Sequence, residues 1–294
     1  MHKLRQNLSH LYTVLFLCYL IAPLVVMSGA AFNDSKLPSI VPWKGWTGRW
    51  FVDLWNDDRM LMAFANTLWV ATAVAVISVI IGTAAAILIN SISGRVRTVL
   101  YSMMIATILI PGVVIGISTM IMWTKLGGAL FGPEGKPFPF IPGLHLSVLG
   151  QVSYIAAMVM LLVLARLQSF DPGLEEAALD LGASHGQVMR RILLPHLYPA
   201  IFAGGAVAFF QSIENFNVTQ FTRGGADTLT VYVFSKVRSG ITPTINALAF
   251  LLICVTLVLA VIYEVNRRRR ARIEAAREAE ARRAEEMSEM TGVA

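Results

Sequence analysis

Charged residues are scarce in this sequence. Only 14% of its 294 residues are Asp, Glu, Lys or Arg, whereas 56% are hydrophobic, and the mean hydropathy is +0.64. A soluble globular protein carries about 25% charged residues. The shortage therefore predicts an integral membrane protein. The net charge of +6 does not indicate a nucleic-acid partner, because the arginines gather beside apolar segments, as membrane topology requires.

Residues that build enzymatic or metal sites are also few. Cys18 and Cys254 are the two cysteines, and both lie in apolar segments, which excludes a disulfide framework or a cysteine metal site. The five histidines show no metal-ligand spacing. The Gly- and Pro-rich stretch 125–146 is not a phosphate-binding loop, because no strand precedes it and no Lys-Ser/Thr pair follows. Without paired carboxylates or a Ser/His/Asp set, we expect a chain that is not an enzyme and that binds no metal, cofactor or ATP itself.

The sequence contains several long runs of apolar residues. Each has roughly the 20 residues that a membrane-spanning helix needs, and polar or Gly/Pro-rich segments separate them. Pro111 lies inside the third run and predicts a kink there. The sequence predicts an all-α membrane protein with six transmembrane helices, over residues 11–31, 61–90, 98–123, 147–165, 197–221 and 242–263.

The first apolar run allows two interpretations. A basic start, an apolar core and the small residues Ser28-Gly29-Ala30-Ala31 are also typical of a cleaved signal peptide. The run is longer than the usual signal core of about 7–15 residues, and it contains Pro23. We therefore expect a retained span.

The distribution of Lys and Arg predicts the orientation. A start inside the cell places the larger share of them on the cytoplasmic side, mainly because of the arginine-rich tail, so both termini are expected there. The expected parts are a cytoplasmic head (1–10), the first span (11–31), a periplasmic segment (32–60), a core of five spans (61–263) and a charged cytoplasmic tail (264–294).

A polar island interrupts the core between the fourth and fifth spans, at residues 171–195. Asp171-Pro172 is a helix start, because Asp caps a helix and Pro suits its first position. Gly182 is a helix end, since Gly adopts the left-handed conformation. Ser184 and Gln187 form a capping-box pattern for a second helix, which we expect Pro195 to close. The island is thus predicted to be two short helices with a bend at Gly182.

This island resembles the EAA loop of permease subunits of binding-protein-dependent ABC importers. The matching positions are Glu176-Ala177-Ala178, Gly182, Ile192 and Leu194-Pro195. The resemblance implies the six-helix fold of type I importer permeases, in which the first short helix is a coupling helix that docks on a cytoplasmic ATPase. It assigns ATPase coupling to Glu175, Glu176, Ala177, Ala178, Asp180, Gly182 and Pro195.

The same resemblance implies partners and a location. The partners are a second permease subunit in a heterodimer, two cytoplasmic ABC ATPase subunits that bind ATP and Mg, and a periplasmic or surface solute-binding protein. The location is the lipid bilayer of the bacterial inner membrane, with no nucleic acid involved. Three shorter stretches resemble the second permease of spermidine/putrescine-type systems and make a polyamine the expected solute: Phe32-Asn33-Asp34-Ser35, Asn66-Thr67-Leu68 and Ile245-Asn246-Ala247-Leu248-Ala249.

The sequence leaves the roles of two segments undecided, the tryptophan-rich periplasmic segment and the charged tail. The tryptophans of the periplasmic segment fit either an interfacial aromatic layer or simple loop packing: Trp43, Trp46, Trp50 and Trp55. The tail alternates Arg and Glu over residues 271–290, which predicts a solvated helix with i,i+4 charge pairs. That helix either extends the last span or contacts anionic lipid or the ATPase.

Polar residues in the outer half of the fifth span are the candidate lining of a translocation path. Charged side chains in a bilayer usually face a cavity or a partner. The candidates are Gln211, Glu214, Asn215, Asn217 and Thr219, with Gln211, Asn215 and Thr219 on one helical face. The alternative is that the span ends near Gln211 and the patch is interfacial. Asn66 and Asn246 line the path or pack helices, and packing is the commoner use.

The solute class depends on this patch. Polyamine-type permeases commonly carry adjacent acidic residues at the corresponding place, whereas this chain has Glu214-Asn215. The departure leaves open an amino-acid-like or organophosphorus solute. A secondary transporter is a rival class that requires internal repeats and paired broken helices around ion ligands, and the sequence shows no such repeat.

Overall fold

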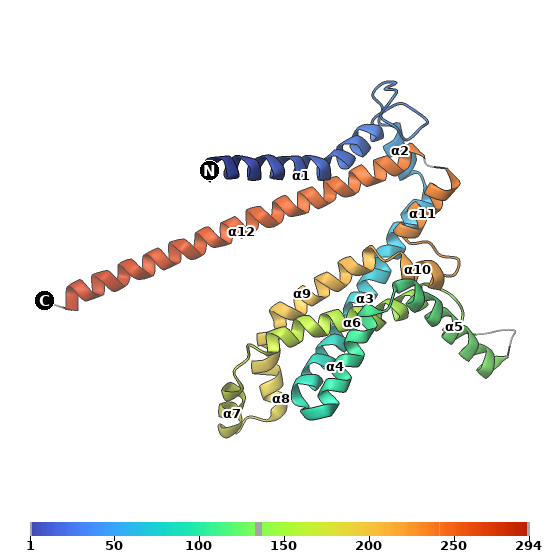
Figure 1. Ribbon diagram of the computed structural model, residues 1–294. Coiled ribbons are helices and arrows are strands. Elements are labelled where there is room, and N and C mark those ends of the chain that lie inside the picture. Colours follow the sequence, from blue (N-terminus) through green and yellow to red (C-terminus); the bar gives the residue numbers. More distant parts are fainter. Residues whose placement is uncertain (1, 133–136, 241, 293–294) are drawn as a thin grey trace. The chain divides into compact units, whose positions relative to one another are not determined.

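The computed structural model describes residues 2–132, 137–240 and 242–292, with side chains described except at 2–5, 270 and 274–292 (Figure 1). The described residues are almost entirely helical, with one isolated β-bridge between Asn33 and Trp46. Among them, six helical segments have the length and apolar composition of membrane spans: Gln6–Ala31, Asp58–Ser91, Gly112–Phe131, Leu144–Leu167, His185–Ile213 and Pro243–Ile273. The predicted all-α class with six membrane helices is confirmed.

The smaller of two compact units contains Met1–Asn56 and Gly240–Ala294. It holds α1 (His2–Ala31), α2 (Arg49–Trp55) and α12 (Pro243–Gly292), and both α1 and α2 pack on α12. The Phe32 ring lies 5.2 Å from that of Phe51 and 5.0 Å from that of Phe250, centroid to centroid, which joins the three elements. α12 runs without a break across the expected boundary between last span and tail. The charge pairs expected beyond residue 273 lie outside the described side chains.

The loop between α1 and α2 closes around Asn33, which is fully buried. Its side chain donates to two loop carbonyls and accepts from the Lys44 N–H at 2.8 Å. Trp50, only 7% exposed, donates its indole N–H to the Asn33 carbonyl at 2.8 Å. Trp50 is therefore a packing residue, whereas Trp46 and Trp55 are 80% and 72% exposed. The Phe-Asn-Asp-Ser stretch noted in the sequence thus includes the residue that organises this loop.

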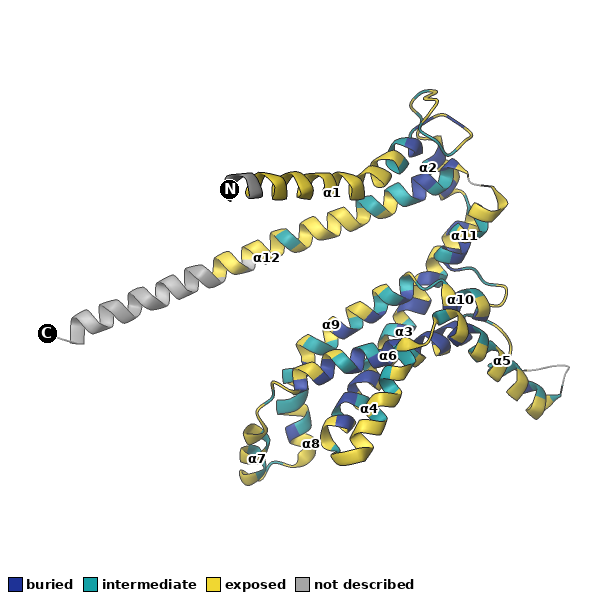
Figure 2. Cartoon of the chain, viewed as in Figure 1, coloured by how far each residue is buried: buried dark blue, intermediate teal, exposed yellow. Residues whose placement is uncertain are grey.

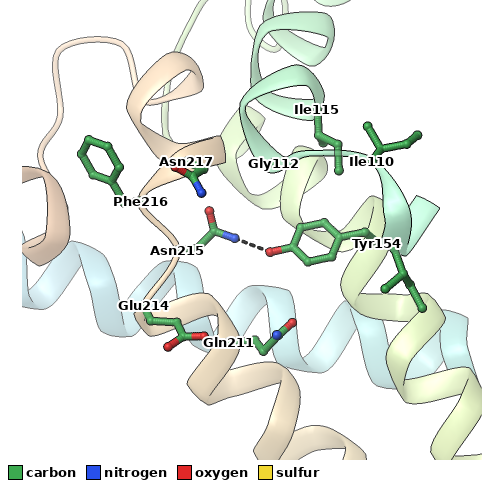
Figure 3. Close-up of a pocket in the computed structure, with 10 residues that line it drawn as sticks. Ile110, Gly112, Ile115, Tyr154, Gln211, Glu214, Asn215, Phe216 and Asn217 are labelled. Atoms are coloured by element: carbon green, nitrogen blue, oxygen red, sulfur yellow. Dashed lines mark hydrogen bonds between the residues drawn. The ribbon is translucent and has the colours of Figure 1, made fainter. Parts of the chain in front are cut away.

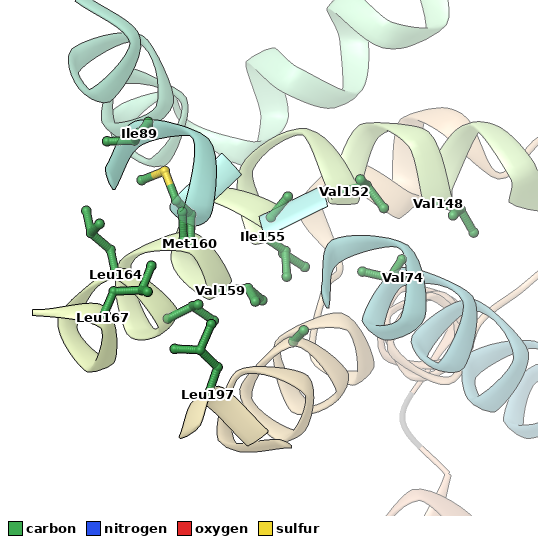
Figure 4. Close-up of a cluster of buried hydrophobic side chains, with 14 of the residues drawn as sticks. Val74, Ile89, Val148, Val152, Ile155, Val159, Met160, Leu164, Leu167 and Leu197 are labelled. Carbon is green, nitrogen blue, oxygen red and sulfur yellow. The ribbon is translucent and has the colours of Figure 1, made fainter. Parts of the chain in front are cut away.

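The larger unit, Asp57–Ser239, is built on three mutually packed helices: α3 (Asp58–Ser91), α6 (Leu144–Leu167) and α9 (Leu194–Ile213). Figure 4 shows the buried side chains between them, among which Ile155, Val159 and Met160 are fully buried. Gly82 lets α3 and α6 approach closely, because a Cβ there would lie 2.6 Å from the Ala156 carbonyl oxygen. Small residues at helix contacts are the usual means of packing in a bilayer.

The third predicted span, 98–123, is interrupted at Pro111 as expected, but the interruption separates two helices and does not merely kink one. The chain forms two helices, α4 (Gly94–Leu109) and α5 (Gly112–Phe131), with Pro111 as the cap of α5. Proline lacks an N–H and disfavours the helical conformation in the residue before it, here Ile110, so a kink becomes a break. α5 also extends to Phe131, into the stretch expected to be loop. Of the two pieces, α5 has the length of a span.

Polar groups attach α11 (Leu229–Ser239) to the start of α3. Asp57 caps α3 by accepting from the Met60 N–H, and its second oxygen accepts from Tyr232 at 2.8 Å and Lys236 at 3.1 Å. Partial burial raises the pKa of the Asp57 carboxyl, but these hydrogen bonds outweigh burial and hold it below its ordinary value. Asn66 donates to the Asp227 carbonyl at 2.8 Å, which supports its packing interpretation.

Candidate functional site

The polar island begins as expected, with α7 (Pro172–Asp180). The Asp171 carboxylate accepts from the Gly173 N–H at 2.9 Å, and Pro172 occupies the first turn. Glu175 lies in that turn, where the helix dipole favours negative charge. The helix ends before Gly182, whose φ is +84°. The predicted cap and bend are confirmed.

The second half of the island starts with the predicted capping box. Ser184 Oγ accepts from the Gln187 N–H at 3.3 Å, and Gln187 Oε1 accepts from the Ser184 N–H at 2.8 Å. The prediction that Pro195 closes this helix is wrong. α8 (His185–Val188) leads through a π-helical turn, η1 (Met189–Leu193), into α9, and Pro195 lies in the first turn of α9. The missing N–H of a proline is tolerated in a first turn, and the wider π turn before it accommodates the ring.

The island is open to its surroundings on most sides. Figure 2 shows α7 largely exposed at one end of the larger unit. Leu174 is 53% and Leu181 89% exposed, although both are apolar. Of the residues assigned to coupling, the exposed ones are Glu176, Ala177, Asp180, Gly182 and Pro195, while Glu175 and Ala178 are half-buried.

Arg166 and His196 form a clasp at the base of the island, which the sequence did not predict. Arg166 at the end of α6 donates to the His196 carbonyl at 3.2 Å, and the His196 ring lies 3.3 Å from the Arg166 carbonyl oxygen. Phe170 packs on the same imidazole with centroids 5.3 Å apart. The clasp joins the two ends of the island, at the end of α6 and the start of α9.

A cavity of about 300 Å³ lies where two helices are interrupted (Figure 3). One interruption separates α4 from α5 at Ile110-Pro111. The other separates α9 from α10 (Asn217–Thr222) at residues 214–216, so the predicted fifth span, 197–221, is not one helix. The cavity is lined by Ile108, Ile110, Gly112, Ile115, Tyr154, Gln211, Glu214, Asn215, Phe216 and Asn217. Irregular backbone at membrane depth is tolerated only where it is buried in protein or lines a water-filled cavity.

These paired interruptions were expected only of a secondary transporter. Broken helices therefore do not distinguish a secondary transporter from an ABC importer permease in this chain. No group of three or more His, Cys, Asp or Glu residues suited to a metal ion occurs in the described part of the chain.

Four of the five predicted path residues line this cavity, namely Gln211, Glu214, Asn215 and Asn217. Thr219 does not, because it is 1% exposed and accepts a hydrogen bond from Gln151 at 2.9 Å. The expectation of one helical face through Gln211, Asn215 and Thr219 is wrong, since α9 ends at Ile213 and the chain changes direction.

Polar side chains of α6 hold the interrupted turn in place. Gln151 is fully buried; its amide oxygen accepts from Ser212 at 2.5 Å and its amide nitrogen donates to Thr219. One turn further along α6, the Tyr154 hydroxyl accepts from Asn215, the bond drawn in Figure 3. Asn215 also accepts from the Val218 N–H at 3.1 Å, which caps α10. Gln151 and Tyr154 were not among the predicted path residues, although a glutamine within an apolar helix is a signal of a polar contact or cavity.

Small residues form the other side of this support. Val218 is fully buried in α10. A Cβ at Gly150 of α6 would lie 2.7 Å from Val218 Cγ1, and one at Gly116 of α5 would lie 3.0 Å from its carbonyl oxygen. The glycines therefore allow α10 to lie against both helices.

The Glu214 carboxylate is the charged group that the cavity leaves exposed. Gln211 Oε1 is buried without a partner among the described residues. The two residues are three apart, so they lie on the same side of α9, as Figure 3 shows. The remaining lining is amide, hydroxyl or apolar, and Glu214 is its one charged residue.

Comparison with known proteins agrees with this architecture. The model of the family "binding-protein-dependent transport system inner membrane component" matches residues 78–272. The putrescine transport system permease protein PotI of Escherichia coli K12 is 35% identical over 238 residues, covering 80% of this chain and 82% of that protein. The spermidine/putrescine transport system permease protein PotC of Haemophilus influenzae is 27% identical over 262 residues, covering 89% and 96%.

A solved structure supports the fold. The crystal structure of a bacterial ABC transporter involved in the import of the acidic polysaccharide alginate contains a chain with a TM-score of 0.70 and 19% identity, covering 88% of this chain and 93% of that one. Because the family model spans about two thirds of the sequence and a relative exceeds 30% identity over most of it, the chain belongs to the family of binding-protein-dependent transport system inner membrane components, as a non-catalytic, multi-pass permease subunit of an ABC importer.

Proposed function

We propose that this permease imports a small organic cation with primary amines, such as putrescine or spermidine. The observation that carries the proposal is the exposed Glu214 carboxylate, the one charged group in the cavity lining. A primary ammonium carries a positive charge and three N–H donors and has no acceptor, so it matches this carboxylate. A carboxylate in a bilayer costs about 2.5–3.5 kcal/mol on insertion scales, which a bound cation offsets.

The lining disfavours an anionic solute. A phosphonate or sulfate in the cavity would meet the Glu214 charge with no cationic side chain among the lining residues. The names of PotI and PotC, which refer to putrescine and spermidine, support the same class.

The amide at position 215 has a separate explanation. Asn215 donates to Tyr154 and caps α10, so both ends of its side chain are occupied. Glu214 then neutralises one ammonium, and a second ammonium would meet a group on the partner permease. A zwitterionic amino acid is the alternative solute, because its ammonium fits Glu214 while its carboxylate requires a donor.

Coupling and assembly follow the family pattern. We infer that α7 faces the cytoplasm with both termini, and that its exposed leucines contact an ATPase subunit. The complete transporter would combine this chain with a second permease, two ATPase subunits that bind ATP and Mg, and a solute-binding protein. ATP-driven closure of the ATPases would move α7, and the Arg166–His196 clasp would carry that movement to α6 and α9, which border the cavity.

The test is the ATPase activity of the reconstituted complex with its binding protein, measured with putrescine, spermidine, amino acids and phosphonates. Stimulation by a polyamine is expected, and Glu214→Gln should raise the solute concentration needed for half-maximal uptake by about tenfold, equivalent to roughly 1.4 kcal/mol. Asp58→Asn makes the same chemical change at an exposed position of α3 and serves as the matched control. Stimulation by a phosphonate alone would refute the cation proposal.

A further inference from the structure

A second hollow, of about 340 Å³, lies between α10 and α11. The side chains that carry the argument are Gln220 and Arg223 on one side and Phe234, Ser235 and Arg238 on the other. All belong to the larger unit, and none lines the translocation cavity.

Arg223 lies at the edge of the hollow with part of its charge accessible. It uses one terminal nitrogen on Asp227, at 2.5 Å, and on the Ala226 carbonyl, at 3.0 Å. Its Nε is buried and, within the described ranges, unpaired, as is Gln220 Oε1. The Arg223 side chain is 22% exposed, so an entering group meets the guanidinium charge and not the buried Nε.

The charge of the hollow is positive. Asp227 already balances two arginines, since Arg59 approaches it at 2.6 Å from α3 while Arg223 approaches from α10. Arg238 is exposed, and its guanidinium carbon lies 5.8 Å from the centre of the Phe234 ring. Arg223 and Arg238 therefore border the hollow, and the carboxylate that pairs with Arg223, that of Asp227, is shared with Arg59. Arginine binds carboxylates in a bidentate geometry, which adds direction to the attraction.

The place of the hollow along the chain predicts which side of the membrane it faces. α10 and α11 follow one end of α9, and α7 precedes the other end (Figure 1). If α7 faces the cytoplasm, as proposed above, the hollow faces outward, where the solute-binding protein approaches. Phe234 also packs on Phe216, a residue of the cavity lining, with ring centroids 4.7 Å apart. Phe234 therefore joins the lining of the hollow to the lining of the cavity.

We propose that this hollow receives an Asp or Glu side chain of the solute-binding protein, held by Arg223 and Arg238. The proposal rests on the inferred orientation and is independent of which solute is carried. Charged groups at the edge of an interface act mainly on the association rate and its salt dependence. The hollow thus contributes to docking and leaves the transport step itself unchanged.

The test is Arg238→Glu, because Arg238 is exposed and its replacement spares the buried network. In proteoliposomes of the complete complex, the binding-protein concentration for half-maximal ATPase stimulation should rise about tenfold, with an unchanged maximum and a weaker dependence on salt. Arg238→Lys should retain most of the affinity. Lys36→Glu, the same charge reversal at an exposed position of the loop between α1 and α2, should have little effect.

Three results would overturn the proposal. One is an unchanged half-maximal concentration in Arg238→Glu. Another is a lowered maximum alone. The third is a response only to anionic lipid content, which would assign the hollow to a lipid headgroup. The solute panel can be run at saturating binding protein, so a failure of the cation proposal is distinguishable from a failure of this one.

Discussion

The island and the cavity turn both interrupt helices, but different forces hold them. In the island, the Asp171 cap, the left-handed Gly182 and the Ser184–Gln187 box connect residues no more than three positions apart. In the cavity turn, Gln151 contacts Ser212 across 61 positions of sequence. A local hydrogen bond survives when neighbouring helices move, whereas a long-range one depends on their arrangement. The difference suits a rigid surface for coupling and a turn that responds to the packing of α5 and α6.

The largest expected effect is on the island. Gly182→Asp should reduce uptake at least about tenfold while membrane insertion is retained, because a side chain at φ +84° is strained and adds a charge to an exposed coupling surface. Uptake by membrane vesicles, normalised to inserted protein, measures it. Gly182→Asn separates the two causes, since asparagine has nearly the shape and backbone preference of aspartate but no charge. Normal uptake by a well-inserted Gly182→Asp protein would rule the prediction out.

A smaller loss is expected at the cavity turn. Gln151→Leu leaves the Ser212 and Thr219 hydroxyls without their partner. An orphaned buried polar group costs about 1–3 kcal/mol, although hydrogen bonds within membranes average about 0.6 kcal/mol. We expect a lower thermal midpoint of the detergent-purified complex and reduced uptake. The control is Gln168→Leu, at an exposed position just after the same helix. Equal behaviour of the two variants would show that Gln151 does not hold the turn.

The close contact between Gly150 of α6 and Val218 of α10 can be tested with a pair of compensating substitutions. Gly150→Ala should destabilise by about 1–3 kcal/mol through overpacking against Val218. Val218→Ala removes the contacting methyl groups, so the double variant should be more stable than the sum of the single changes predicts. A double-mutant cycle of unfolding free energies measures this coupling. Strict additivity would mean that α10 shifts away freely and that the close packing is unimportant.

The smallest expected effect is that of the capping box. Ser184→Ala removes an N-cap worth about 1 kcal/mol. Because the bond is local, faster hydrogen exchange should be confined to the amides of α8 and η1, and uptake should change little. Faster exchange in α10 would contradict the contrast between local and long-range support.

The sequence alone determined the elements that depend on neighbouring residues. Apolar runs long enough to cross a bilayer predicted six membrane helices, and Asp171, Gly182 and Ser184 predicted the caps and bend of the island. The same local logic failed at Pro195. Whether a proline ends a helix or sits in its first turn depends on where the next helix begins.

Only the tertiary structure decided the cavity. The sequence left open whether the fifth span ends near Gln211 or continues to residue 221, because the groups that hold the turn belong to α5 and α6; the structure ends α9 at Ile213. Tyr154 and Gln151 take up the polar side chains of the turn, and Gly116 and Gly150 make room for α10. Such contacts join residues far apart in the chain, and no local preference predicts them. The sequence by itself therefore determined the membrane helices and the caps and bend of the island, while packing between distant helices determined which polar residues face the cavity.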